Sequence, residues 1–188
     1  MMPNCATSCD RVAQQALKDS KELSSIGSFF DLSANDIHGK TISFSEFQGQ
    51  VTVLVNVASY CGFTDSHYRG LVQLYSSLEH VHSQINILAF PCNQFGAQEP
   101  GSNDSIENFA LGYGVEFTMM EKIDVNGPNA SIVFKYLKAN AKGGPNNISW
   151  NFATYFVVSP DGSMTAHSGI EPMQLKENVL ELLESDEL

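Results

Sequence analysis

The segment that decides the fold is VTVLVNVAS (residues 51–59), which leads through Tyr60 into the turn CGFT (61–64). The first nine residues form a β-branched apolar run, which is typical of a strand buried on both faces of a sheet. After the turn, apolar residues recur at helical spacing, at Tyr68, Leu71, Val72, Tyr75 and Leu78. A second apolar run, INILAF (85–90), follows. Strand, helix and strand in this order predict a right-handed βαβ unit with parallel strands.

The rest of the chain adds elements on both sides of this unit. The segments FFDLSAND (29–36) and TISFSEF (41–47) alternate around His38-Gly39-Lys40, which predicts an N-terminal β-hairpin. Shorter helices are expected at 104–110 and 130–139, and a last helix from Pro172. Two strands flank the turn Pro160-Asp161-Gly162. We therefore predict an α/β fold, a central mixed sheet with helices on both faces.

The length of 188 residues fits one compact domain. Residues 1–27 are polar and are expected to form an N-terminal extension, with a short helix around 12–23. Residues 28–188 are expected to form the single domain. Cys5 and Cys9 lie in the extension, and the four cysteines match no paired-thiolate zinc pattern.

Composition excludes several classes of partner. Ten Lys and Arg residues stand against 21 Asp and Glu residues, so the formal net charge is −11. A nucleic acid or an anionic membrane would be repelled. No apolar stretch approaches the roughly 20 residues that a membrane-spanning helix needs.

Cys61 is the first candidate for chemistry. It follows the carboxyl end of the predicted central strand and precedes a helix, where open α/β sheets place ligands and where the helix dipole favours a thiolate. The turn has the spacing of a C-x-x-C motif, but Thr64 replaces the second cysteine. A single activated thiol is therefore expected. A buried, inert cysteine is the alternative, against which its place beyond the strand end argues.

Three segments together resemble the glutathione peroxidase family: VNVASYCGFT (55–64), LAFPCNQFG (88–96) and WNF (150–152). The similarity extends from about Phe29 to the last helix. Within the family, CGFTDSHY (61–68) and the ending Asp-Glu-Leu are most similar to the small cysteine-dependent members of the endoplasmic reticulum. The resemblance implies a thioredoxin-like fold and reduction of hydrogen peroxide and of organic or lipid hydroperoxides.

The resemblance also assigns roles: Cys61 would be the peroxidatic thiol, and Gln94, Trp150 and Asn151 its partners. A thiol of ordinary pKa is about 3% thiolate at pH 7, so complete ionisation raises reactivity by only ~30-fold. Most of the acceleration must come from donors that stabilise charge on the peroxide oxygens. The amides of Gln94 and Asn151 and the indole N–H of Trp150 are suitable uncharged donors. Turn capping and core packing are their alternative, structural roles.

The sequence does not decide which thiol reacts with the oxidised Cys61 in the resolving step. Cys92 belongs to the family segment whatever the mechanism, and it is a possible resolving cysteine. Thioredoxin-dependent relatives carry a resolving cysteine on the next helix, where this chain has Leu111. His67, near the start of the first helix, could assist Cys61, although solvation is the more usual fate of such a histidine.

The reductant is expected to be a protein. Only Arg11 and Arg69 are present, so an arginine cluster for anionic glutathione is not evident and glutathione should be the weaker donor. The resemblance points to protein disulfide isomerase instead. Tetrameric members of the family have a longer segment before WNF that builds subunit contacts, so the resemblance, together with the short segment KANAKGGPNNIS (138–149), implies a monomer. No cofactor and no metal site are expected.

The chain ends Ser185-Asp186-Glu187-Leu188, a variant of the retrieval signal of the endoplasmic reticulum lumen, and no signal peptide is visible. Two functions of other classes compete with the peroxidase. One is a peroxide sensor or thiol-relay protein with little turnover, and the other is a catalytically silent interaction domain.

Overall fold

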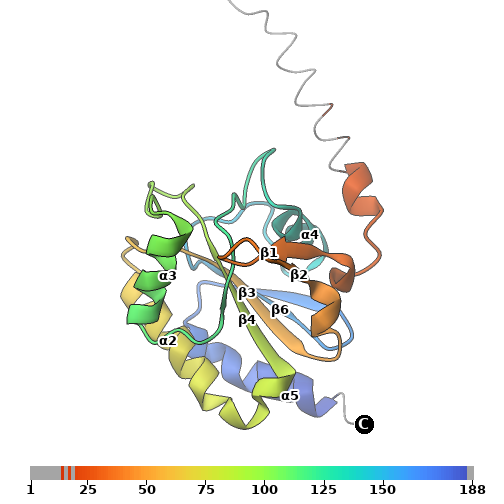
Figure 1. The fold of residues 1–188 in the computed structure, drawn as a ribbon. Coiled ribbons are helices and arrows are strands. Elements are labelled where there is room, and N and C mark those ends of the chain that lie inside the picture. The colour runs from red at the N-terminus through yellow and green to blue at the C-terminus, as the bar shows by residue number, and fades with distance from the viewer. Residues whose placement is uncertain (1–13, 15–16, 18–19, 186–188) are drawn as a thin grey trace, which may run out of the picture.

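The computed structural model describes residues 14, 17 and 20–185. A five-stranded sheet in the order β5-β4-β3-β6-β7 forms its centre, and a separate two-stranded hairpin lies near the N-terminal end (Figure 1). Cys5, Cys9, Arg11 and most of the retrieval-like ending lie outside the described residues, as does half of the helix expected at 12–23. Residues 14, 17 and 20–23 of that helix are described and are helical.

The predicted βαβ unit is confirmed. Strand β3 (Val51–Val57) pairs in parallel with β4 (Ile85–Pro91), and helix α2 (Thr64–Ser77) connects them through the short 3-10 helix η3 (Glu79–Gln84). All seven residues of β3 are buried, as its continuous apolar run predicted. This pairing places the ends of both strands, and the segments that follow them, at one edge of the sheet.

The C-terminal half adds antiparallel strands beside β3. Strand β6 (Thr154–Val158) pairs antiparallel with β3 and with β7 (Met164–Ser168), and Gly162 in the turn between them has a φ of 88°, which favours glycine. At the opposite edge of the sheet, the two-residue strand β5 (Thr118–Met119) pairs in parallel with β4. Strand β5 was not predicted, because two residues show no periodicity.

The N-terminal hairpin is present but shorter than predicted. Strands β1 (Ser33–Asn35) and β2 (Thr41–Ser43) pair antiparallel around the expected turn. The aromatic ends of the two predicted segments instead form 3-10 helices, η1 (Phe29–Asp31) and η2 (Phe44–Phe47). Their rings pack on one another, with 5.0 Å between the centroids of Phe29 and Phe44, so these residues join the core rather than the hairpin.

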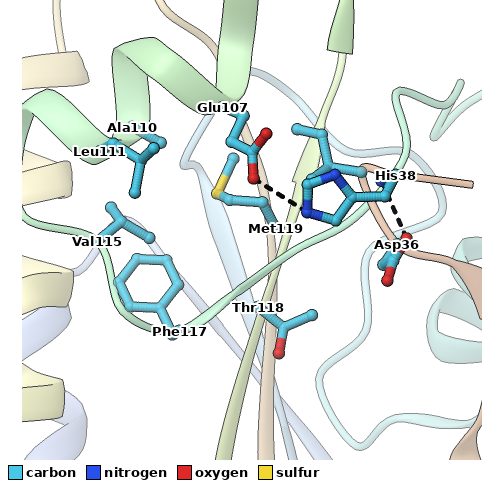
Figure 2. Close-up of a pocket in the computed structure, with 10 residues that line it drawn as sticks. Asp36, His38, Glu107, Ala110, Leu111, Val115, Phe117, Thr118 and Met119 are labelled. Carbon is cyan, nitrogen blue, oxygen red and sulfur yellow. Dashed lines mark hydrogen bonds and ion pairs between the residues drawn. The ribbon is translucent and has the colours of Figure 1, made fainter. Parts of the chain in front are cut away.

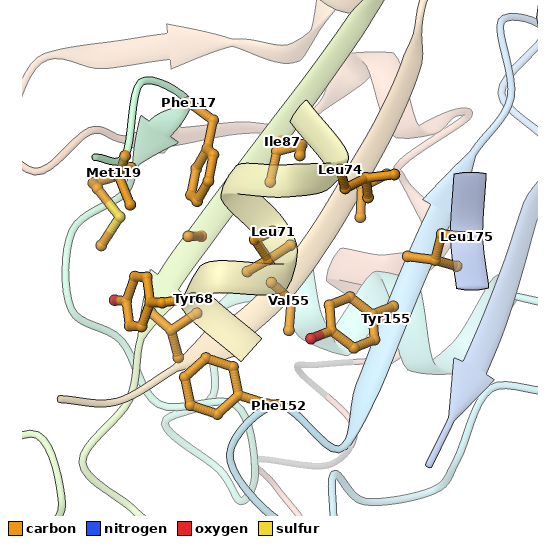
Figure 3. Packing of buried hydrophobic residues seen from close by; sticks show 14 of the residues in the cluster. Val55, Tyr68, Leu71, Leu74, Ile87, Phe117, Met119, Phe152, Tyr155 and Leu175 are labelled. Carbon is orange, nitrogen blue, oxygen red and sulfur yellow. The ribbon is translucent and has the colours of Figure 1, made fainter. Parts of the chain in front are cut away.

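Alternating strand residues divide the core into two clusters on opposite faces of the sheet. One contains Val55 and Ile87 of the strands, Tyr68 and Leu71 of α2, and Val179 of α5 (Lys176–Ser185) (Figure 3). The predicted last helix begins as the 3-10 helix η4 (Pro172–Leu175) before α5. Helix α3 (Asn103–Gly112) joins the same cluster through Ile106 and Ala110.

The second cluster lies on the opposite face and contains Leu54, Leu88 and Phe156, covered by helix α4 (Ile132–Asn140). Partly buried Leu23 and Ile26 also pack there, so described residues of the predicted extension contact the core. Helices on both faces of a mixed sheet, built from a βαβ and a ββα unit, confirm the predicted thioredoxin-like fold.

Candidate active site

Cys61 lies in the turn between β3 and α2, as expected. Its side chain is 8% exposed, and its Sγ accepts a hydrogen bond from the backbone N–H of Phe63 at 3.5 Å. That N–H belongs to the residue that immediately precedes α2, where the helix dipole attracts negative charge. The sulfur of Cys61 thus has a hydrogen-bond donor although the residue is almost completely buried.

Thr64 closes this turn. Its Oγ1 donates to the carbonyl of Ala58 at 2.6 Å and accepts the backbone N–H of Cys61 at 3.0 Å. The N-cap of α2 is Phe63, and no side chain caps it, so the bonds of Thr64 serve the turn rather than the helix end. Thr64 stands where a C-x-x-C motif has its second cysteine, and its hydroxyl fixes the backbone at Ala58 and at Cys61.

Gln94 follows β4, and its amide is occupied by the neighbouring loop. Its Oε1 accepts the backbone N–H groups of Val125 and Asn126 at 2.8 and 2.9 Å, and its Nε2 donates to the carbonyl of Asn126 at 2.9 Å. The Asn126 side chain in turn bonds both backbone groups of Ile148, two residues before Trp150. In this arrangement, Gln94 is linked through Asn126 to Ile148, and its amide would have to leave these bonds to donate to a peroxide.

Trp150 is placed differently. Its side chain is 39% exposed and packs on Phe95, with ring centroids 5.8 Å apart. Its indole N–H donates to no residue within the described part of the chain. Trp150 and Phe63 line a common pocket of about 390 Å³, and Phe63 is the residue whose N–H reaches Cys61. The indole is thus an available donor beside a pocket that Phe63 also lines.

Asn151 is fully buried in a chain of side-chain amides. It accepts a hydrogen bond from Asn56 of β3 at 3.3 Å and donates one to Oε1 of Gln98 at 3.1 Å. The following residue, Phe152, has a φ of 61°, and its N–H donates to the carbonyl of Asn56. These bonds hold the segment 150–152 to the central strand, so the structure gives Asn151 a structural contact.

Gln98 and Glu99 are the site residues that the sequence reasoning missed. The carbonyl of Gln98 accepts the N–H of Tyr60, and the Glu99 carboxyl accepts the hydroxyl proton of Ser59 at 2.8 Å. The N–H of Glu99 donates to Asn93 at 2.8 Å. This pair therefore joins all three family segments. Their position directly after LAFPCNQFG was the available signal.

His67 is buried, which contradicts the expectation of a solvated side chain. Its Nδ1 shares a hydrogen bond with the Tyr155 hydroxyl at 2.6 Å, and its Nε2 lies 3.8 Å from the Glu171 carboxylate. Burial lowers the pKa of His67, and the negative charge of Glu171 opposes that shift. Both imidazole nitrogens are thus occupied, one by Tyr155 of β6 and the other by Glu171.

Cys92 has no exposed surface and lies directly after β4. Its backbone N–H donates to the carbonyl of Val57 at 3.0 Å, so the ends of β3 and β4 are adjacent. Burial raises the pKa of the Cys92 thiol, and the carboxylates of Asp124 and Glu99 add to this effect. Cys61 and Cys92 are both free thiols.

Leu111 occupies the exposed side of α3, where thioredoxin-dependent relatives would carry a cysteine. It lines a separate pocket of about 240 Å³ between α3 and the hairpin turn, with His38 and Glu107 3.1 Å apart at its mouth (Figure 2). None of the predicted site residues lines this pocket. Among the described residues, no group of three His, Cys, Asp or Glu side chains could hold a metal ion, and no helix is long and apolar enough to cross a membrane.

Comparison with known proteins identifies the family. The family model described as glutathione peroxidase matches residues 29–138. Human glutathione peroxidase 7 is 50% identical over 137 residues, 72% of this chain and 70% of that protein. A probable phospholipid hydroperoxide glutathione peroxidase of Citrus sinensis is 40% identical over 163 residues, 84% of this chain and 95% of that protein.

A solved structure agrees with these relatives. The crystal structure of Trgpx in its apo form superimposes with a TM-score of 0.69 at 31% identity, and the match covers 84% of this chain and 95% of that one. This solved structure thus has the same fold as the chain. The fold carries the turn that holds Cys61, the segment after β4 and the segment around Trp150. The chain belongs to the glutathione peroxidase family and is a peroxidase that reduces peroxides with thiols.

Proposed function

We propose that Cys61 is the peroxidatic cysteine and that it reduces hydrogen peroxide and organic or lipid hydroperoxides. The observation that carries this assignment is the Phe63 N–H directed at Cys61 Sγ in a turn clamped by Thr64. The thiolate attacks one peroxide oxygen, the O–O bond breaks, and the second oxygen leaves as water or an alcohol after it takes a proton. Cys61 is left as a sulfenic acid.

Trp150 is the donor best placed to stabilise the departing oxygen, because its indole N–H is not used by any described residue. Gln94 can act in the same way only after its amide leaves the loop at 125–126. Asn151 acts with Asn56 and Gln98 to hold this segment in place. We therefore assign hydrogen-bond donation to the departing oxygen first to Trp150 and second to Gln94.

The proposed reductant is a protein dithiol of the protein disulfide isomerase type, with glutathione as a weaker donor. Arg69 is already bonded to Asp65 at 2.9 Å and lies over the Tyr113 ring, so it is not a ready partner for the carboxylates of glutathione. Large aromatic side chains are exposed around Cys61 instead, 69% for Tyr60 and 52% for Phe63. Such side chains suit contact with a protein surface.

In this cycle, a thiolate of the reductant attacks the sulfenic sulfur of Cys61, and hydroxide leaves as water after protonation. The second thiol of the reductant then attacks the mixed disulfide, which releases reduced Cys61 and an oxidised reductant. One peroxide and two thiols thus yield one disulfide, one alcohol or water, and one further water. We also propose a monomer in the endoplasmic reticulum lumen, on the basis of the segment before Trp150 and the last four residues.

A turnover assay tests the assignment. The protein is given hydrogen peroxide or a lipid hydroperoxide with reduced protein disulfide isomerase or with glutathione, and peroxide consumption is followed. Cys61→Ser should abolish turnover because serine does not ionise near pH 7, while Cys92→Ser serves as the matched control. Residual turnover in Cys61→Ser would refute the role of Cys61. Stoichiometric oxidation without turnover would instead support a peroxide sensor or thiol-relay protein.

A further inference from the structure

Glu99 is an unusual residue for its surroundings. Among the residues that the structure describes, it is the only acidic side chain in the buried class, with no exposed surface. One carboxyl oxygen, Oε1, accepts the hydroxyl proton of Ser59 at 2.8 Å. The other oxygen, Oε2, is buried and has no partner among the described residues.

The nearest cation does not neutralise this carboxyl directly. The ammonium of Lys122 donates to the backbone carbonyls of Glu99 and Gly101 rather than to the side chain. An ionised carboxylate that is bonded only by Ser59 and has no ion pair is expensive to bury, whereas a neutral carboxyl is much less so. The geometry therefore favours the protonated form.

The electrostatic setting agrees with this reading. Burial raises the pKa of Glu99, and the Ser59 hydrogen bonds and the charge of Lys122 oppose that shift. The other titratable groups that interact with Glu99 are Tyr68 of α2 and Cys92 after β4. Burial raises the pKa of both, which favours their neutral forms, and neither side chain can carry a positive charge that would compensate an ionised Glu99.

Glu99 also lies behind the reactive turn. Ser59 and Tyr60 immediately precede Cys61, and they bond Glu99 and Gln98 respectively. The backbone N–H of Glu99 is fixed by Asn93 of the segment after β4. Movement of the carboxyl would therefore be passed to the residues next to Cys61.

We propose that Glu99 is a positioning residue for the reaction of Cys61, which acts as a neutral carboxyl and holds the turn through Ser59. The inference rests on the proposed role of Cys61. When Glu99 ionises at higher pH, the uncompensated charge draws its carboxyl toward water, and the turn that presents Cys61 loosens. The charge also opposes the negative charge that develops during attack on the peroxide.

The first test compares the rate of Cys61 oxidation by hydrogen peroxide in the wild type and in Glu99→Gln across a pH series. Glutamine has the same shape and can accept the Ser59 proton, but it does not ionise. The ratio of the Glu99→Gln rate to the wild-type rate should stay near one at acidic pH and rise by up to about tenfold per pH unit once Glu99 ionises. The exposed Glu46→Gln is the control for loss of one negative charge.

Ser59→Ala provides a second, directional readout. By the proposal, the carboxyl acts on the turn through the Ser59 hydroxyl, so Ser59→Ala should lower the rate already at acidic pH, and the effect of Glu99→Gln in this background should depend less on pH. A ratio that does not change with pH, the same rise in Glu46→Gln, or an undiminished rise of the ratio in the Ser59→Ala background would overturn the proposal. A purely structural role of Glu99 would change the rate without changing its pH profile.

Two measurements separate this inference from the proposed function. The free energy of unfolding of Glu99→Gln should increase relative to the wild type as pH rises above about 4.3, because only the wild type must keep a carboxyl protonated to stay folded. The alkylation rate of Cys61 by iodoacetamide reports on the same turn without peroxide. If Cys61 does not react with peroxide, the proposed function fails, while these two pH series still decide the role of Glu99. If the difference between Glu99→Gln and the wild type does not change with pH in either measurement, the proposal is overturned.

Discussion

Cys61 and Cys92 pack against opposite faces of the central sheet. Cys61 belongs to the cluster that contains Val55 and Ile87, and Cys92 to the cluster that contains Leu54 and Leu88. A disulfide between two cysteines requires their Cα atoms within about 7 Å and their Cβ atoms directed toward each other. The backbone of Cys92 is near the end of β3, but its side chain is directed away from the cluster of Cys61.

The first prediction is that Cys92→Ser keeps most of the turnover supported by protein disulfide isomerase. An internal disulfide would require Cys92 to leave its cluster, and the raised pKa of its thiol makes it a poor nucleophile. Steady-state peroxide consumption at saturating reduced isomerase is the measurement. A loss of more than about tenfold, which corresponds to ~1.4 kcal/mol of barrier, would show that the internal disulfide is obligatory. Mass spectrometry of the peroxide-treated wild type should show little Cys61–Cys92 bridge.

The second prediction concerns Trp150. Trp150→Phe removes the indole N–H and retains an aromatic ring against Phe95, so oxidation of Cys61 should slow by about 10- to 1,000-fold while the fold is preserved. Stopped-flow mixing with peroxide, followed by quantification of remaining thiol, measures the rate. Phe95→Leu is the matched control, because it alters the same ring contact without removing a donor. A rate within about twofold of the wild type would assign Trp150 to packing alone.

The third prediction separates two roles of Gln94. Gln94→Ala should lower the free energy of unfolding by about 0.5–1.5 kcal/mol per lost hydrogen bond, because Val125 and Asn126 lose their partner. If its amide also reaches the peroxide, the oxidation rate should fall by about 10- to 1,000-fold as well. Asn126→Ala loosens the same loop and leaves Gln94 intact, so it should lower stability with little change in rate. Equal rate losses in both variants would mean that Gln94 acts only through the loop.

The fold was largely predictable because its central elements are long and periodic. The run at 51–59 is buried along all of β3, and the helical spacing from Tyr68 to Leu78 marks the buried side of α2. Strand β5 and the 3-10 helices at Phe29 and Phe44 are too short to show a period. Their placement depends on neighbours distant in sequence, which periodicity does not encode.

The polar contacts of the site were the least predictable part. Ser59 and Glu99 are 40 residues apart, and Asn56 and Asn151 are 95 residues apart, yet each pair is bonded. Residue type shows that these side chains can bond, but only the register of β3 against β4 and β6 decides with which partner. The same reason explains His67, whose burial depends on the hydroxyl that Tyr155 presents from β6.

The last prediction uses this buried histidine. An unfolded chain has an ordinary histidine pKa of about 6.5, whereas burial against Tyr155 and Phe152 lowers the pKa of His67 in the folded protein. Below about pH 6.5 the unfolded chain therefore binds a proton that the folded protein does not, and the free energy of unfolding must fall as pH falls. The loss continues until the pH reaches the pKa of folded His67.

Urea unfolding at a series of pH values from about 7 to about 5 measures this dependence. His67→Gln should change the slope in this range, and the remainder should combine His167, whose pKa is also lowered by burial, with the opposite contribution of Glu99, whose pKa is raised by burial. Glu171→Gln is the informative companion variant, because removal of the nearby carboxylate lowers the pKa of His67 further and should extend the loss of stability to lower pH. Parallel curves for the wild type and His67→Gln would show that His67 takes up its proton without leaving the contact with Tyr155.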